Sequence, residues 1–167
     1  MENFISRLLF SAMCIAIAGL VAGLLFALIP KEFFLKNERF FVPFKFEDGG
    51  RLYSRVFKIN TWKDKLPQFS ELTKIGFDKT ALTNLSANYL ELFKIETMRA
   101  EFTHVFLIIT SPLYAFFGTR IIVPLTVIGS MIGNIPFLMI QRYNRARIEK
   151  LMKHLSRTAP NSETSPT

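Results

Sequence analysis

Three long apolar runs, separated by charged segments, set the hydrophobic pattern of the chain. They cover residues 8–29, 102–119 and 121–140. A helix needs roughly 20 mostly apolar residues to cross a bilayer. Between the second and third runs only Arg120 is charged, and Gly118-Thr119-Arg120 is typical of a tight connection. The pattern therefore predicts an all-α integral membrane protein with about three transmembrane helices, the last two forming a C-terminal hairpin.

The first run has a second interpretation, a cleaved signal peptide. The apolar core of such a peptide usually spans roughly 7–15 residues, which is shorter than this run, and no clean A-x-A cleavage site follows it. We therefore favour a retained anchor. Gly19 and Gly23 have the small-xxx-small spacing that lets another helix approach closely.

The segment between the first two spans, residues 31–101, mixes phenylalanines with charges and is predicted to be an amphipathic segment at the membrane interface. Gly49-Gly50 indicates a turn. Residues 54–60 fit either a short strand or a helical turn, and residues 83–98 show helical spacing that continues toward the second span. Residues 1–157 would form a single membrane domain, and the Ser-, Thr- and Pro-rich residues 158–167 a disordered tail.

Composition and charge support a membrane protein. Half of the 167 residues are apolar, 18 are Phe, and the formal net charge is +8. The basic residues flank apolar spans or alternate with acids, so we expect contact with lipid headgroups and no nucleic-acid partner. Lys and Arg cluster after the first and third spans, which predicts an N-terminus outside and a C-terminus in the cytoplasm. Cys14 is the single cysteine, and we predict neither metal nor cofactor.

Candidate chemistry begins with Glu101 and His104, which are neighbours on one face if the segment is helical. A carboxylate beside an imidazole can fix its tautomer, and the ring can then act as a general base toward a hydroxyl. Arg99 lies around the helix from His104, so it is expected to pair with Glu96 or to bind an anion. The alternative is an interfacial charge belt without catalytic function, which spacing alone favours.

A second polar group ends the third run. On a continuous helix Asn134, Gln141 and Arg145 fall on one narrow stripe, although Pro136 predicts a kink. Guanidinium groups at this end suit phosphates or carboxylates. Ordinary positive-inside anchoring is the alternative, and it explains the Gln-Arg-Tyr-Asn-Arg sequence poorly. Trp62 is a natural interface anchor, and it stands beside Lys63.

Four motifs carry a family resemblance. They are Trp62-Lys63-x-Lys65, Glu96-Thr-x-Arg99-Ala-Glu101-x-x-His104, Asn134-x-Pro136 and Gln141-Arg142-Tyr143-Asn144-Arg145-x-Arg147. In order and approximate spacing they resemble the glycosyl-4,4'-diaponeurosporenoate acyltransferase family, which consists of small bacterial membrane proteins. The resemblance implies O-acyl transfer to a sugar hydroxyl of a glycosylated carotenoid acid, the last step toward staphyloxanthin-type pigments. Ala146 and Val105 depart from residues often found in the family.

The resemblance gives the expected partners: a lipid or carotenoid glycoside acceptor, an activated fatty acyl donor and a bacterial cell membrane. Our hypothesis makes His104 the general base and Glu101 the residue that orients its ring. The expected substrate-binding residues are Arg99, Asn134, Gln141, Arg142, Asn144, Arg145, Arg147, Trp62 and Lys63. Two alternatives remain: a non-catalytic membrane protein that binds lipid or isoprenoid and assists assembly, and a lipid methyltransferase, for which no nucleotide-cofactor motif is present.

Overall fold

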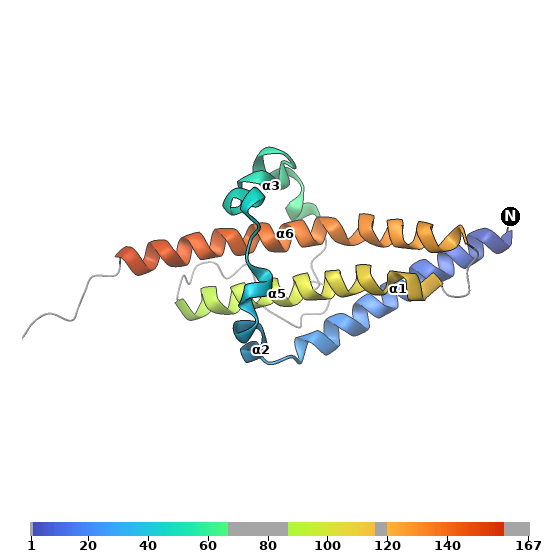
Figure 1. The fold of residues 1–167 in the computed structure, drawn as a ribbon, viewed down its shortest axis with the longest axis horizontal. Helices are drawn as coiled ribbons and strands as arrows, with labels where there is room; N and C mark the ends of the chain where they lie inside the picture. The colour runs from blue at the N-terminus through green and yellow to red at the C-terminus, as the bar shows by residue number, and fades with distance from the viewer. Residues whose placement is uncertain (1, 67–86, 116–119, 159–167) are drawn as a thin grey trace, which may run out of the picture.

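Three long helices form the body of the molecule (Figure 1). This computed structural model describes residues 2–66, 87–115 and 120–158, and all regular structure within those ranges is helical. The long helices are α1 (Glu2–Ala27), α5 (Ala87–Thr110) and α6 (Ile122–Thr158). Helices α5 and α6 lie side by side and antiparallel, and α1 packs obliquely against both. This antiparallel pairing agrees with the expected C-terminal hairpin, whose residues 116–119 lie outside the described ranges.

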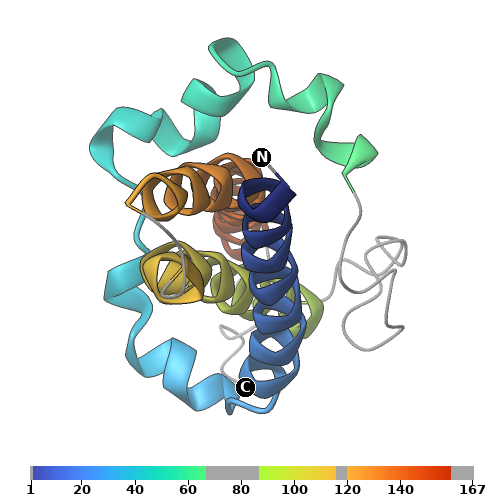
Figure 2. The same ribbon diagram turned by 90° about the vertical axis from the view of Figure 1, so that its right-hand side faces the viewer.

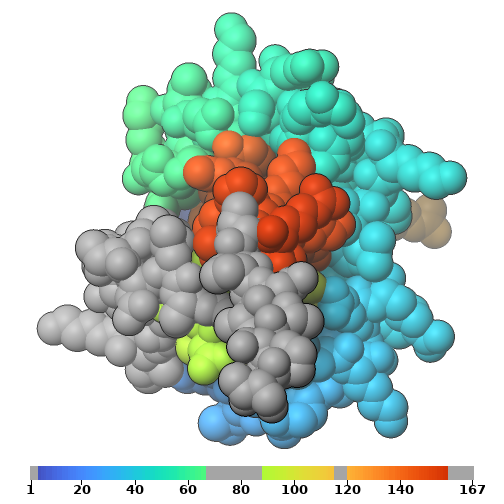
Figure 3. Space-filling view, turned by 90° about the vertical axis from the view of Figure 1, so that its left-hand side faces the viewer, coloured from blue at the N-terminus to red at the C-terminus, as the bar shows by residue number. Residues whose placement is uncertain are grey.

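Residues 30–66, which we call the strap, lead from α1 around the other two long helices (Figure 2). The strap is built from short helical pieces: α2 (Lys31–Lys36), η1 (Glu38–Phe41), η2 (Lys45–Gly50), α3 (Arg51–Arg55), η3 (Ile59–Thr61) and η4 (Lys63–Lys65). Its first part packs on α5 and its second part on α6. In Figure 3 the strap covers one side of the C-terminal half of α6. Residues 54–60 are thus helical turns rather than a strand.

Small hydrophobic clusters hold these elements together. Phe34 and Phe41 of the strap pack on Met98 of α5, and Tyr53 of the strap packs on Tyr143 of α6. A third cluster, Leu90, Phe93 and Ile148, joins α5 to α6. These three clusters therefore lie in the half of the bundle where the strap meets α5 and α6.

In the opposite half of the bundle, many large apolar side chains lie on the outside. Leu9, Ile109 and Ile132 are all more than 60% exposed. An exposed apolar surface of this size fits lipid as its surroundings. Two helices are long and apolar enough to cross a membrane, Phe4–Ala27 and Ile122–Arg157.

The second predicted span, residues 102–119, is not among these candidates. Helix α5 ends at Thr110 and is followed by the 3₁₀ helix η5 (Ser111–Ala115). The N-terminal half of α5 carries charged residues, so its apolar part is too short to meet the criterion by itself. The prediction of three spans is therefore not confirmed, whereas the all-helical prediction is confirmed for the described residues.

Pro136 lies within α6, and the helix continues on both sides of it, so the proline does not end the helix. A Cβ placed on Gly19 would lie 3.4 Å from Leu107 Cδ1, which agrees with close packing of α1 on α5. The expected helix at 83–98 is described from residue 87 onward, within α5. The predicted tail at 158–167 lies outside the described residues except for Thr158, the last residue of α6.

Candidate active site

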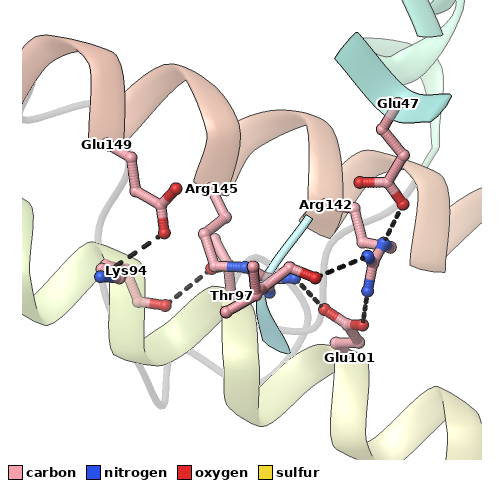
Figure 4. A network of polar contacts seen from close by, with 8 residues as sticks. Glu47, Lys94, Thr97, Glu101, Arg142, Arg145 and Glu149 are labelled. Atoms are coloured by element: carbon pink, nitrogen blue, oxygen red, sulfur yellow. Dashed lines mark hydrogen bonds and ion pairs between the residues drawn. The ribbon is translucent and has the colours of Figure 1, made fainter. Parts of the chain in front are cut away.

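Glu101 of α5 is the centre of a buried ion-pair network (Figure 4). Arg142 of α6 donates from Nη1 to Glu101 Oε1 at 2.5 Å and from Nε to Glu47 Oε1 at 2.6 Å. Arg145, one turn further along α6, forms an ion pair with the second carboxylate oxygen of Glu101. Three segments distant in sequence, the strap, α5 and α6, therefore meet at two arginines and two carboxylates.

Because these carboxylates and arginines are largely buried, each charge needs an opposite charge close to it. Glu47 is 1% exposed, Glu101 6% and Arg145 0%. A charge removed from water is tolerated when an opposite charge and hydrogen bonds replace its hydration. Arg142 also donates from Nη2 to the carbonyl oxygen of Val42 at 3.3 Å, so all three of its nitrogens have acceptors. Each nitrogen of Arg142 therefore donates to an acceptor within the protein.

Arg145 is less completely bonded than Arg142. Its contact with Glu101 is short, but the angles are not those of a hydrogen bond, and Nε and Nη1 have no acceptor among the described residues. The guanidinium carbon lies 5.8 Å from the centre of the Phe41 ring. Arg145 thus retains, beside the Glu101 carboxylate, N–H groups that donate to none of the described residues.

Lys94 extends the network toward the start of α5. It forms ion pairs with Glu38 of the strap and, at 3.5 Å, with Glu149 of α6. Thr97 is buried between Lys94 and Glu101 and donates to the Lys94 carbonyl oxygen at 2.7 Å. These contacts tie the strap to the same pair of helices at a second point.

His104 lies one turn beyond Glu101, toward the apolar half of the bundle. Its Nδ1 is 2.8 Å from Asn134 Oδ1, and its ring stacks on Phe137 with centroids 5.0 Å apart. The Asn134 amide nitrogen donates to the Ser130 carbonyl oxygen at 2.8 Å. A carbonyl accepts only, so this bond fixes the amide with Oδ1 toward the histidine.

The fixed amide determines the histidine tautomer. Because Asn134 Oδ1 is an acceptor, His104 Nδ1 must carry the proton. In the neutral ring Nε2 then has the free lone pair, and it makes no hydrogen bond to the described residues. An imidazole with one nitrogen held by a fixed acceptor and the other unengaged has the arrangement that a general base requires.

A pocket of about 340 Å³ lies between the strap and α5. Its wall is mostly aromatic, with Glu101 and Asn37 as the polar members. The lining residues are Phe33, Asn37, Phe40, Phe41, Glu101, Phe102 and Val105. The apolar part of α5 begins at Phe102, so the pocket opens where the polar and apolar halves of the molecule meet.

Tyr53 of the strap lies on the Glu47 side of this network. Burial raises its pKa to about 12, and the neighbouring Glu47 carboxylate adds to that effect. The phenol is therefore neutral at physiological pH. Its role is to pack the strap on α6, together with Ile59 and Tyr143.

The structure brings together the two polar groups that the sequence singled out. Glu101 meets Arg142 and Arg145, and His104 meets Asn134. Asn134, Gln141 and Arg145 are all buried, as residues of one stripe on α6. The prediction that Glu101 orients the His104 ring is wrong. Two guanidinium groups attract the carboxylate more strongly than a neutral imidazole does, and Asn134 takes the position beside the ring.

Other predicted substrate-binding residues have structural partners instead. Arg99 forms an ion pair with Glu96, as expected, and donates from Nη2 to the Ile29 carbonyl oxygen at 2.9 Å, which fixes the end of α1. Trp62 donates to the Phe57 carbonyl oxygen at 2.8 Å and belongs to the cluster that packs the strap on α6. Lys63 pairs with Asp64 at 2.5 Å.

Two further members of the expected set lie on α6. Arg147 is exposed and stacks over Tyr143, with its guanidinium carbon 5.5 Å from the ring centre. Asn144 is half-buried. Neither belongs to the network around Glu101.

Sequence reasoning missed Glu47 and Asn37. Glu47 stands two residues before Gly49-Gly50. Its position next to a predicted turn was the only sequence feature that could have drawn attention to it. Its burial depends on how the strap folds over α6, which periodicity does not reveal. Asn37 ends α2 and gave no signal beyond its type.

The fold and site together define the class: an all-helical protein with two candidate membrane spans and a buried polar centre where its polar and apolar halves meet. A family model described as glycosyl-4,4'-diaponeurosporenoate acyltransferase matches residues 37–154. Proteins of that name from Staphylococcus aureus strains RF122 / ET3-1 and MRSA252 are 30% identical over 158 residues, which cover 94% of this chain and 94% of each relative. The chain belongs to this acyltransferase family.

No solved structure matches the chain. Membership of the family makes the chain an acyltransferase, so the alternative of a non-catalytic assembly protein is set aside.

Proposed function

We propose that the chain transfers a fatty acyl group to a sugar hydroxyl of a glycosylated carotenoid or a similar glycolipid. The relatives' name specifies an acyltransferase of glycosyl-4,4'-diaponeurosporenoate. The observation that carries the proposal is the His104–Asn134–Ser130 arrangement, because it presents a free imidazole nitrogen beside a buried polar centre.

In the proposed reaction His104 Nε2 takes the proton from the sugar hydroxyl as the oxygen attacks the acyl carbonyl carbon. The carbon–oxygen ester bond forms, the bond to the donor's leaving group breaks, and the proton passes to that group. Asn134 is a positioning residue that holds the ring in the required tautomer. This replaces the original hypothesis of orientation by Glu101.

Negative charge develops on the carbonyl oxygen during the attack, and preorganised N–H groups stabilise it. Arg145 is the better candidate of the two central arginines, because its Nε and Nη1 have no acceptor among the described residues. Arg142 has its nitrogens engaged and instead maintains the network. Gln141, buried on the same stripe, is a second candidate donor.

We also propose a topology. Helices α1 and α6 cross the membrane, and the apolar end of α5 together with η5 makes the third crossing. The strap and the C-terminal half of α6 then lie at the cytoplasmic face, where Lys and Arg are concentrated. An acyl donor dissolved in the cytoplasm and an acceptor dissolved in the membrane would reach the site from opposite sides.

Lipid analysis of cells with and without the gene tests the proposal. Mass spectrometry of extracts is expected to show an acylated glycolipid that disappears on deletion and returns with the wild-type gene. The gene carrying Ile109→Ala, an exposed position on α5, should also restore it. Extracts that are identical with and without the gene would contradict the proposed function.

A further inference from the structure

The two polar residues that line the pocket between the strap and α5 both present hydrogen-bond acceptors to it. Asn37 donates from Nδ2 to the Phe33 carbonyl oxygen at 2.8 Å, so its Oδ1 is the amide group left for a ligand. Glu101 is an acceptor when ionised. Both polar residues of the lining therefore offer acceptors, and the ligand must supply the donors.

The charges around the pocket exclude an anionic occupant. Glu101 borders the pocket, and the two nearby guanidinium groups already contact its carboxylate. A carboxylate or phosphate entering here would meet acceptor oxygens, and no lysine or arginine among the described residues lines the pocket. Like charges placed together in a poorly hydrated site repel strongly. Hydroxyl groups, by contrast, can donate to both Asn37 and Glu101.

The remaining wall is apolar and reaches the outside of the molecule. Phe40 is 68% exposed and Phe33 43%, so the mouth is formed by aromatic rings at the surface. Phe102 and Val105 continue the wall along α5 into its apolar part. An occupant with an apolar body extending outward and hydroxyls facing inward matches this arrangement.

The pocket also lies near the proposed base. Glu101 and His104 are three residues apart on one helix, so their Cβ atoms are about 5–6 Å apart. A sugar that binds Glu101 through one hydroxyl can therefore present another hydroxyl to His104.

We propose that this pocket binds the acyl acceptor, an uncharged glycoside with an apolar aglycone, and not the acyl chain of the donor. The inference rests on the proposed function for the identity of its ligand. The sugar donates hydroxyl hydrogen bonds to Asn37 and Glu101, and the aglycone lies along the phenylalanine rings. The donor then approaches from the other side of Glu101, where Arg145 and Gln141 lie.

Photolabelling tests the pocket without any need for turnover. The full chain is reconstituted in phosphatidylcholine nanodiscs and irradiated with an alkyl β-glucoside whose alkyl chain carries a diazirine. Labelled peptides are then identified by mass spectrometry. We expect labels within residues 33–41 and 102–105, and competition by excess unmodified alkyl glucoside but not by a fatty acid of equal chain length. Equal competition by the fatty acid would overturn the proposal.

A pair of tryptophan variants on α5 supplies the control. Val105→Trp places a large ring in the pocket and should reduce labelling at least fivefold, whereas Ile109→Trp, one turn further on and exposed, should leave it unchanged. Unchanged labelling in Val105→Trp would also overturn the proposal.

Kinetics separates this inference from the proposed function. Asn37→Leu should raise KM for the glycoside severalfold and leave KM for the acyl donor unchanged. A rise in the donor's KM alone would assign the pocket to the donor. Specific labelling without acyl transfer to any glycoside would support the pocket and contradict the function.

Discussion

At the scale of single residues, the site depends on Glu101 serving two arginines at once. Its carboxylate accepts from Arg142 through Oε1 and forms an ion pair with Arg145 through Oε2. Arg145 has no exposed surface, and Glu101 is its ion-pair partner among the described residues. The loss of this carboxylate leaves a buried cation without compensation.

Glu101→Gln should therefore destabilise the protein by about 3–5 kcal/mol, the range for breaking a buried ion pair from one side. Unfolding of the detergent-solubilised protein, followed by circular dichroism, measures the change. Asp48→Asn is the matched control, because Asp48 forms an exposed pair with Arg51 and should alter stability little. Similar stability in the two variants would contradict the assigned role of Glu101.

Tyr53 predicts a pH effect at the same scale. An unfolded tyrosine ionises near pH 10, whereas burial holds the pKa of Tyr53 at about 12. Its contribution to stability is therefore complete below pH 10 and is lost as the pH rises toward 12. The loss should reach about 2–3 kcal/mol.

Tyr53→Phe isolates this effect from other groups that titrate in the same range. The difference in unfolding free energy between wild type and variant, measured from pH 9 to pH 12, should shift in favour of the variant as the pH rises. A constant difference over that range would show that Tyr53 ionises at its ordinary pKa.

At the scale of elements, the docking of the strap depends on its glycine turn. Gly49 and Gly50 have φ values of +59° and +89°, and a Cβ on Gly50 would lie 3.2 Å from Ala146 Cβ. A side chain at Gly50 is thus opposed by both its backbone conformation and its contact with α6. This turn places Glu47 over Arg142.

Gly50→Ala should destabilise the folded protein by about 1–3 kcal/mol and weaken the attachment of the strap. Hydrogen exchange of residues 45–55 should then increase. Gly129→Ala is the control, since a Cβ there meets nothing within 4 Å and alanine favours a helix. Unchanged exchange in Gly50→Ala would contradict the docking argument.

The elements differ in how well the sequence predicted them. Helices α1 and α6 were predictable, because each contains an apolar run long enough to cross a membrane. The break in the second run after Thr110 was missed, because Ser111-Pro112 lies inside an apolar stretch. The path of the strap was not predictable, because contacts with α5 and α6 decide its position more than local preferences do.

At the scale of the whole molecule, the bundle has a polar, strap-covered half and an apolar half whose large apolar side chains are exposed. The site lies at their junction, because α5 becomes apolar after Glu101 and α6 becomes polar after Ile140. Convergence of the two polar motifs was predictable from an antiparallel hairpin. Which residues pair within the site was not predictable, because the pairing depends on Glu47, which the strap brings to Arg142.

Cysteine labelling tests the proposed topology. With Cys14 replaced by Ser, single cysteines at Arg120 and Lys153 should react with a membrane-impermeant maleimide from opposite sides of the membrane. In intact cells Arg120→Cys should be labelled and Lys153→Cys protected until the cells are opened. Labelling of both from one side would contradict a crossing by α6.

The central claim is acyl transfer with His104 as the base, and the rate of ester formation by the purified, reconstituted protein tests it most directly. His104→Ala should lower kcat by about 10²–10⁴-fold. Asn134→Leu should lower kcat less. Asn134→Asp keeps an acceptor beside His104 Nδ1, so its kcat should lie between those of Asn134→Leu and the wild type. Transfer by His104→Ala at the wild-type rate would contradict the account.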